Sequence, residues 1–130
     1  MITAMHLLMY SDDAPATRAF LRDVLGLPFV EDAGPEPGWL IFGTGPSEMG
    51  VHPTVSVHEG KEYTSPRQHL ISFMCDDLRA TMDELTAKGA TFSEVGDRGY
   101  GLVTMLDVPG ADAVQLYEPR HALAYTLDDQ

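Results

Sequence analysis

The sequence has few cysteine and few basic residues, and both shortages narrow what the protein can be. A single cysteine, Cys75, excludes an internal disulfide and is compatible with a reducing compartment. Only 8 lysine and arginine residues stand against 20 aspartate and glutamate residues, which gives a formal net charge of −12. Proteins that bind nucleic acid or anionic membranes rely on basic side chains, so we expect neither partner.

Long apolar runs are also missing. Runs such as Met5 to Tyr10 are far shorter than the roughly 20 residues that a membrane-spanning helix needs. The N-terminal stretch lacks the lysine or arginine that begins a signal peptide, so we expect a cytoplasmic protein. With 130 residues, of which 44% are hydrophobic, the chain has enough apolar material for one compact domain.

What the sequence does contain is an internal repeat. The stretch from His6 to Asp13 matches the stretch from His69 to Asp76 in its histidine, leucine and aspartate residues. The same spacing relates Gly26 to Gly89. A match that persists at one spacing indicates two copies of one structural module.

The later part of each copy shows the same relation after a small shift of register. Val51-His52-Pro53 matches Tyr117-Glu118-Pro119. We therefore interpret the chain as a single domain built from two modules. The predicted boundaries are about 1–55 for the first module, 56–65 for a polar linker, 66–119 for the second module and 120–130 for a C-terminal tail.

Each module is predicted to have the order β-α-β-β-β, which gives an α+β fold. Alternating apolar residues predict a strand over 3–10, and the following helix is capped by Asp12 or Asp13 and ended by Gly26. The other elements are strands near 27–31, 38–43 and 47–53, a strand at 68–74, a helix from about Leu78 to Lys88, and strands near 91–95, 100–107 and 112–118.

Four side chains that can bind metal fall on repeat-related positions. His6 and His69 lie on the first strand of each copy, and His52 and Glu118 lie at the end of the fourth. A pseudo-twofold axis between the copies would bring these four groups into one shared cleft. Imidazole and carboxylate together suit a divalent metal ion, which we expect to be Zn²⁺, Fe²⁺, Ni²⁺, Co²⁺ or Mn²⁺.

Other candidate residues are left open or set aside. Strand alternation puts Glu48 on the same face as His52, so Glu48 is the alternative ligand to His52. His58 and His121 have no repeat partner, and we interpret them as surface residues. Cys75 lies in an apolar run and is interpreted as an inert core thiol.

The chain resembles the vicinal oxygen chelate superfamily, which includes glyoxalase I, extradiol dioxygenases and bleomycin-resistance proteins. The resemblance runs through Pro119. It rests on His6, on His69 and on four motifs, LRDVLGLPF at 21–29, DDLRATMDELTAKGATF at 76–92, DVPG at 107–110 and VQLYEP at 114–119. It implies two βαβββ modules around a half-open mixed β-barrel cleft, paired in a homodimer. Whether the modules are exchanged between chains stays open.

The resemblance also implies a site and an activity. Metal ligands in this superfamily come from the first and last strands of each module, which points to His6, His52, His69 and Glu118. The expected enzyme chelates two neighbouring oxygens of a small substrate on the metal, with lyase, isomerase or dioxygenase chemistry.

Further roles are expected for side chains around that metal. Glu118 is the expected catalytic base, because a carboxylate that leaves the metal can accept a proton. Tyr10, Trp39, Phe73 and Tyr100 are expected to line the substrate cleft. The alternative is a protein that binds a bleomycin-type antibiotic without catalysis, which the acidic net charge would suit.

Overall fold

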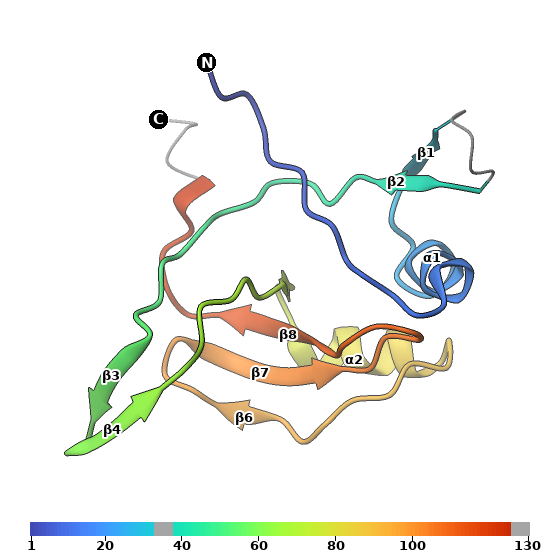
Figure 1. The fold of residues 1–130 in the computed structure, drawn as a ribbon. Coiled ribbons are helices and arrows are strands. Elements are labelled where there is room, and N and C mark those ends of the chain that lie inside the picture. Colours follow the sequence, from blue (N-terminus) through green and yellow to red (C-terminus); the bar gives the residue numbers. More distant parts are fainter. Residues whose placement is uncertain (33–37, 126–130) are drawn as a thin grey trace.

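The structure is a computed structural model that describes residues 1–32 and 38–125 (Figure 1). Within these residues the fold is α+β, as predicted. The helices are α1 (Ala14–Asp23) and α2 (Leu78–Thr86). The strands are β1 (Phe29–Glu31), β2 (Leu40–Phe42), β3 (Val55–His58), β4 (Lys61–Thr64), β5 (Ser72–Met74), β6 (Gly96–Asp97), β7 (Gly101–Leu106) and β8 (Val114–Pro119). In the described part of the chain, no helix is long and apolar enough to cross a membrane.

Both predicted helices are present, and their first turns are capped as expected. The Asp13 carboxylate accepts a hydrogen bond from Ala16 N at 3.2 Å, and the Asp77 carboxylate accepts one from Ala80 N at 3.0 Å. These bonds satisfy backbone amides that have no partner within the helix. Both helices end slightly before the glycine that was predicted to stop them.

The largest sheet has the strand order β5-β8-β7-β6, with β5 parallel to β8 and the other pairs antiparallel. The hydrophobic core lies between this sheet and α2. Leu78 of α2 is 0% exposed and Leu106 of β7 is 1% exposed, and Phe20 of α1 joins the same cluster. The part of the chain predicted to be the second module is therefore a packed unit, and α1 packs against it.

The first module also contacts the second through the start of α1. Asp12 N donates a hydrogen bond to the Gly110 carbonyl oxygen at 2.8 Å, and the Thr17 hydroxyl donates one to the Pro109 carbonyl oxygen. A Cβ atom on Gly110 would lie 2.5 Å from the Ser11 hydroxyl oxygen, so only glycine allows this close approach. The predicted DVPG turn thus provides the surface on which α1 docks.

Some of the strands that the sequence predicts do not form in the single chain. Residues 3–10 and 47–53 form no strand, and Figure 1 draws both as extended chain without arrows. A strand forms only where a neighbour pairs its backbone groups, and these stretches have no such neighbour in the described part of this one chain. The strand predicted at 91–95 reduces to a bridge between Phe92 and Leu106. The half-open barrel cleft stays a prediction.

The stretch predicted to be a linker at 56–65 also differs from expectation, because it belongs to a β-hairpin. β3 and β4 pair along their whole length. Glu59 and Gly60 form the two-residue turn with φ of 52° and 75°. Positive φ at both central residues is the conformation that matches the twist of a tight hairpin. The prediction failed because the polar composition of this stretch was interpreted as typical of a linker.

Candidate functional site

The predicted metal ligands lie apart in the single chain. His6, His52 and His69 are exposed, and each lies outside any strand. His52 Nδ1 is 2.7 Å from the Pro53 carbonyl oxygen. In residues 1–32 and 38–125, no group of three or more histidine, cysteine, aspartate or glutamate side chains is arranged to hold a metal ion. The donor set has suitable chemistry, but it does not fit a metal ion within one chain.

Glu118 has a hydrogen-bond partner within its own module. Its Oε1 atom accepts a hydrogen bond from Leu78 N, at the start of α2, at 3.0 Å. Leu78 N is one of the amides that lack a partner inside the helix, and the positive end of the helix dipole favours a carboxylate there. Val114 and Leu116 precede Glu118 on the same face of β8 and belong to the core. Glu118 therefore lies at the edge of the core, where it ties β8 to α2.

The aromatic residues predicted to line a substrate cleft have different surroundings. Tyr10 is 86% exposed on the N-terminal stretch. The Arg18 guanidinium carbon lies 4.9 Å from the centroid of the Trp39 ring. Phe73 packs against the core, whereas Tyr100 is 45% exposed beside the start of β7. In the described part of the chain no ring contact joins any two of these four residues, and their shared role in lining one cleft stays a prediction.

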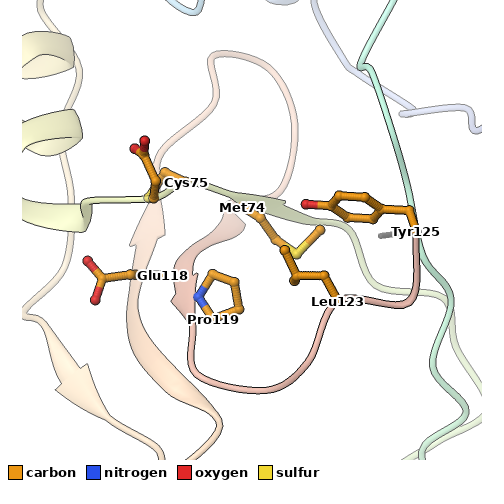
Figure 2. Close-up of a pocket in the computed structure, with 7 residues that line it drawn as sticks. Met74, Cys75, Glu118, Pro119, Leu123 and Tyr125 are labelled. Atoms are coloured by element: carbon orange, nitrogen blue, oxygen red, sulfur yellow. The ribbon is translucent and has the colours of Figure 1, made fainter. Parts of the chain in front are cut away.

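A pocket of about 320 Å³ opens where β5 and β8 end, beside the start of α2 (Figure 2). The residues that line it are Met74, Cys75, Asp76, Glu118, Pro119, Leu123 and Tyr125. Figure 2 shows Leu123 and Tyr125, from the C-terminal segment, near Met74, with Glu118 at the other end. An apolar wall with polar groups at one end is typical of sites for small organic molecules.

Cys75 contributes a thiol to this pocket. Its Sγ atom donates a hydrogen bond to the Tyr117 carbonyl oxygen at 3.6 Å. Burial is the main cause that raises the pKa of the Cys75 thiol, and the negative charges of Glu118, Asp76 and Asp77 raise it further. A thiol with a raised pKa stays protonated and is a poor nucleophile. This agrees with the predicted role of Cys75 as an inert thiol.

A polar cluster that the sequence did not reveal joins the two modules. The Tyr117 hydroxyl lies 3.1 Å from His121 Nε2, and the same nitrogen lies 3.6 Å from Glu48 Oε1. Glu48 Oε2 accepts a hydrogen bond from Ala124 N at 2.9 Å. The Tyr100 ring meets the Tyr117 ring edge to face, with 5.7 Å between centroids. The cluster links residue 48 of the first module to the C-terminal segment.

The surroundings of His121 determine which ring nitrogen carries the proton. His121 Nδ1 lies 2.8 Å from the Ala122 carbonyl oxygen, which can only accept, so Nδ1 is the donor. In the neutral ring, Nε2 then accepts from the Tyr117 hydroxyl. Burial, with a smaller contribution from the charge of Glu48, raises the pKa of Tyr117, which keeps this phenol protonated. His121 is exposed, as predicted, but its contacts with Tyr117 and Glu48 were not predicted, because the C-terminal tail has no counterpart in the first module.

Comparison with known proteins places the chain in a superfamily. A family model described as Glyoxalase/Bleomycin resistance protein/Dioxygenase superfamily matches residues 3–118. The chain belongs to this superfamily. The match spans both modules and confirms the resemblance that the sequence motifs indicated. No relative of curated function matches the chain.

Solved structures of related proteins share the superfamily fold. An antibiotic-binding protein from a Streptomyces species has 16% identity and a TM-score of 0.63, over 91% of this chain and 97% of that chain. A lactoylglutathione lyase from Agrobacterium tumefaciens has 18% identity and a TM-score of 0.58, over 89% and 92%. A superfamily member from Sphaerobacter thermophilus has 18% identity and a TM-score of 0.57, over 90% and 98%. One of these proteins is named for binding and one for catalysis, so function must be argued from the site.

Proposed function

We propose that the protein is a metal-dependent enzyme of the glyoxalase superfamily, whose metal centre is completed only when two copies of the chain pair. The observation that carries this proposal is the placement of the ligand-type residues. His6 and His69 are repeat-related, and so are His52 and Glu118. In the single chain the two histidines of the first module are exposed on stretches without strand partners.

The unpaired stretches support pairing with a second copy. In the second module, β5 pairs in parallel with β8. The repeat-related stretches of the first module are 3–10 and 47–53, which have no strand partner in the described chain. They also expose large apolar side chains, namely Met5, Leu7, Leu8, Met49 and Val51. Unpaired backbone that carries exposed apolar side chains is typical of a segment that a partner covers. A second copy carries the same modules, so we propose a homodimer.

The proposed substrate is a small molecule with two neighbouring oxygen atoms, and the proposed chemistry is of the lyase, isomerase or dioxygenase type. A bound divalent metal would supply Lewis acidity for such a substrate. The acidic chain, with its net charge of −12, would hold a divalent cation more readily than a basic chain would.

A second candidate function is antibiotic binding without catalysis. The specific observation that favours it is the contact of Glu118 with Leu78 N, because a carboxylate that already caps a helix is less available to a metal. The pocket beside Glu118 has an apolar wall that suits a small organic ligand. The similar fold of the Streptomyces antibiotic-binding protein agrees with this candidate.

Metal analysis of the purified full chain separates the two functions. The enzyme predicts about one divalent metal ion per chain, since a symmetric dimer has two equivalent sites. The binding protein predicts no retained metal, together with saturable binding of a bleomycin-type antibiotic in calorimetry. A metal-free protein that also fails to take up Zn²⁺, Fe²⁺, Ni²⁺, Co²⁺ or Mn²⁺ at micromolar concentration would contradict the enzyme proposal.

The substitution Glu118→Gln tests whether Glu118 is the catalytic base. The amide oxygen of glutamine can still accept the hydrogen bond from Leu78 N, so the free energy of unfolding should change by less than about 1 kcal/mol. Glu118→Ala removes that bond and should lower the free energy of unfolding by about 1–2 kcal/mol. Thermal unfolding measures both.

The base role adds a second expectation for Glu118→Gln. An amide cannot accept a proton from substrate, so turnover should fall by about 100-fold or more although the protein stays folded. A Glu118→Gln variant with wild-type turnover would leave Glu118 with a purely structural role.

A further inference from the structure

The pocket beside α2 has a wall that does not belong to the sheet. Leu123 and Tyr125 come from the segment 119–125, which begins at the last residue of β8, and Figure 2 shows both beside Met74. The pocket floor comes from the ends of β5 and β8, which are held by the strand pairing of the second module. The shape of the pocket therefore depends on what holds the segment 119–125 in place.

The start of this segment is tied to the sheet, because Arg120 N donates a hydrogen bond to the Tyr100 carbonyl oxygen at 2.7 Å and His121 contacts Tyr117. Two further contacts of the segment come from Glu48. Glu48 Oε2 accepts a hydrogen bond from Ala124 N at 2.9 Å, directly between the wall residues Leu123 and Tyr125. Glu48 Oε1 lies 3.6 Å from His121 Nε2. The Glu48 side chain is 16% exposed and the His121 side chain 35%, so both contacts are partly shielded from water. One carboxylate thus uses each of its oxygens on a different point of the same segment.

The geometry depends on the length of the Glu48 side chain as well as on its charge. The hydrogen bond to Ala124 N needs an oxygen acceptor that reaches the backbone from residue 48. A neutral amide of the same length can make this bond, whereas a shorter carboxylate cannot reach it without movement of the backbone. Charge contributes only through the contact with His121, which is an ion pair when the imidazole is protonated.

We propose that Glu48 is a positioning residue, which holds the segment 119–125 as the wall of the pocket. The first module would then control which small molecules enter a pocket built by the second module. The chemistry of the lining predicts a ligand with an apolar part against Met74 and Leu123 and a hydrogen-bond donor toward Asp76 or Glu118. This inference deepens the proposed function, because it rests on a small-molecule site, but it requires no metal and no dimer.

The position of Glu48 also couples the wall to the unpaired part of the first module. Glu48 belongs to the stretch between β2 and β3, which contains the unpaired residues 47–53. Pairing of these residues with a second copy would restrain Glu48, and through it the segment 119–125. Assembly would therefore change the access to the pocket.

Cys75 offers a direct probe of this wall. It is the only cysteine in the sequence, and it lines the pocket. Its rate of alkylation by iodoacetamide, a small neutral reagent, reports how often the pocket opens to solvent. The negative charges that raise the pKa of Cys75 belong to Glu118, Asp76 and Asp77 and not to Glu48. A change at Glu48 therefore alters the rate through the exposure of the thiol, which admits the reagent and relieves the burial that raises the pKa. Excess EDTA in the reaction keeps the measurement independent of bound metal.

Four variants separate reach from charge. Glu48→Ala removes both contacts, Glu48→Asp keeps the charge but shortens the side chain, and Glu48→Gln keeps the length but removes the charge. Glu62→Ala is the matched control, because Glu62 is an exposed glutamate of β4 outside the pocket. Thermal unfolding of each variant shows whether a faster reaction arises from local opening or from global unfolding.

The expected result is two groups of alkylation rates, with every variant still fully folded at the temperature of the reaction. Glu48→Ala and Glu48→Asp should each react about fivefold faster than wild type or more, as expected for the loss of one partly buried hydrogen bond. Glu48→Gln and Glu62→Ala should stay within about twofold of wild type. If Glu48→Asp and Glu48→Ala react no faster than Glu62→Ala, Glu48 does not hold the wall. Because this test contains no metal, its failure would leave the metal proposal standing, and absence of metal from the purified protein would leave this test intact.

Discussion

Replacement of His69 by alanine is expected to abolish tight metal binding by the assembled protein. The proposed centre contains four donors, and the two that belong to the second module are His69 and Glu118. Loss of one imidazole should weaken the affinity for a divalent metal by about 100-fold or more, since even the partners that only orient a ligand contribute 10- to 100-fold. Competition with a chromophoric chelator measures this change directly.

The control for this experiment is another exposed histidine. His58 ends β3, is exposed like His69, and has no repeat partner. His58→Ala should therefore leave the affinity unchanged, whereas His69→Ala should lose it. Neither variant should change the thermal stability of the metal-free protein much, because neither side chain is buried. Equal metal affinity in the two variants would show that the site is misassigned.

The sequence predicted those elements whose formation depends on local chemistry. Both helices could be predicted because their capping aspartates, Asp13 and Asp77, and their apolar faces all lie within the helix or next to it. β7 and β8 were also predicted nearly to their ends, because the two strands pair with each other and their apolar residues Leu106, Val114 and Leu116 belong to the core.

The remaining predicted strands form only if another strand pairs with them, and a sequence pattern does not show which strand that is. Residues 3–10 have the same alternation as residues 68–74, yet only the second stretch has a neighbouring strand, β8. An apolar alternation predicts a strand that can form, and the presence of a partner decides whether it does form. The hairpin of β3 and β4 shows the opposite case, because a left-handed turn at Glu59 and Gly60 makes a strand pair from a polar stretch.

The sequence predicted only those candidate site residues that belong to the internal repeat. The repeat related His6 to His69 and His52 to Glu118, but it carried no information on the distances between these side chains. It also passed over His121, whose contacts come from Glu48, far away in the sequence. Such contacts arise from tertiary packing, and the spacing of residues in the sequence does not predict them.

The last prediction concerns which chains supply the donors of one site. α1 already docks on the second module of its own chain, through Asp12 to Gly110 and Thr17 to Pro109. In that arrangement of residues 1–32 and 38–125, the four predicted ligands form no group of three or more that could hold a metal ion. We therefore propose that modules are exchanged, so that the first module of one chain completes a site with the second module of its partner. A protein that stays monomeric at micromolar concentration would contradict this proposal.

Mixing two metal-poor variants decides the question. With exchange, a heterodimer of His6→Ala and His69→Ala chains has one site with both lesions and one intact site. Random pairing makes about half of the dimers heterodimers, so metal content should return to about one quarter of the wild-type value. Without exchange, every site keeps one lesion and no metal returns. The control is His6→Ala mixed with the double variant His6→Ala/His69→Ala, in which exchange still leaves a lesion in every site. Tight metal binding in that control mixture would show that His6 is not a ligand, and no return of metal in the first mixture would place both modules of a site in one chain.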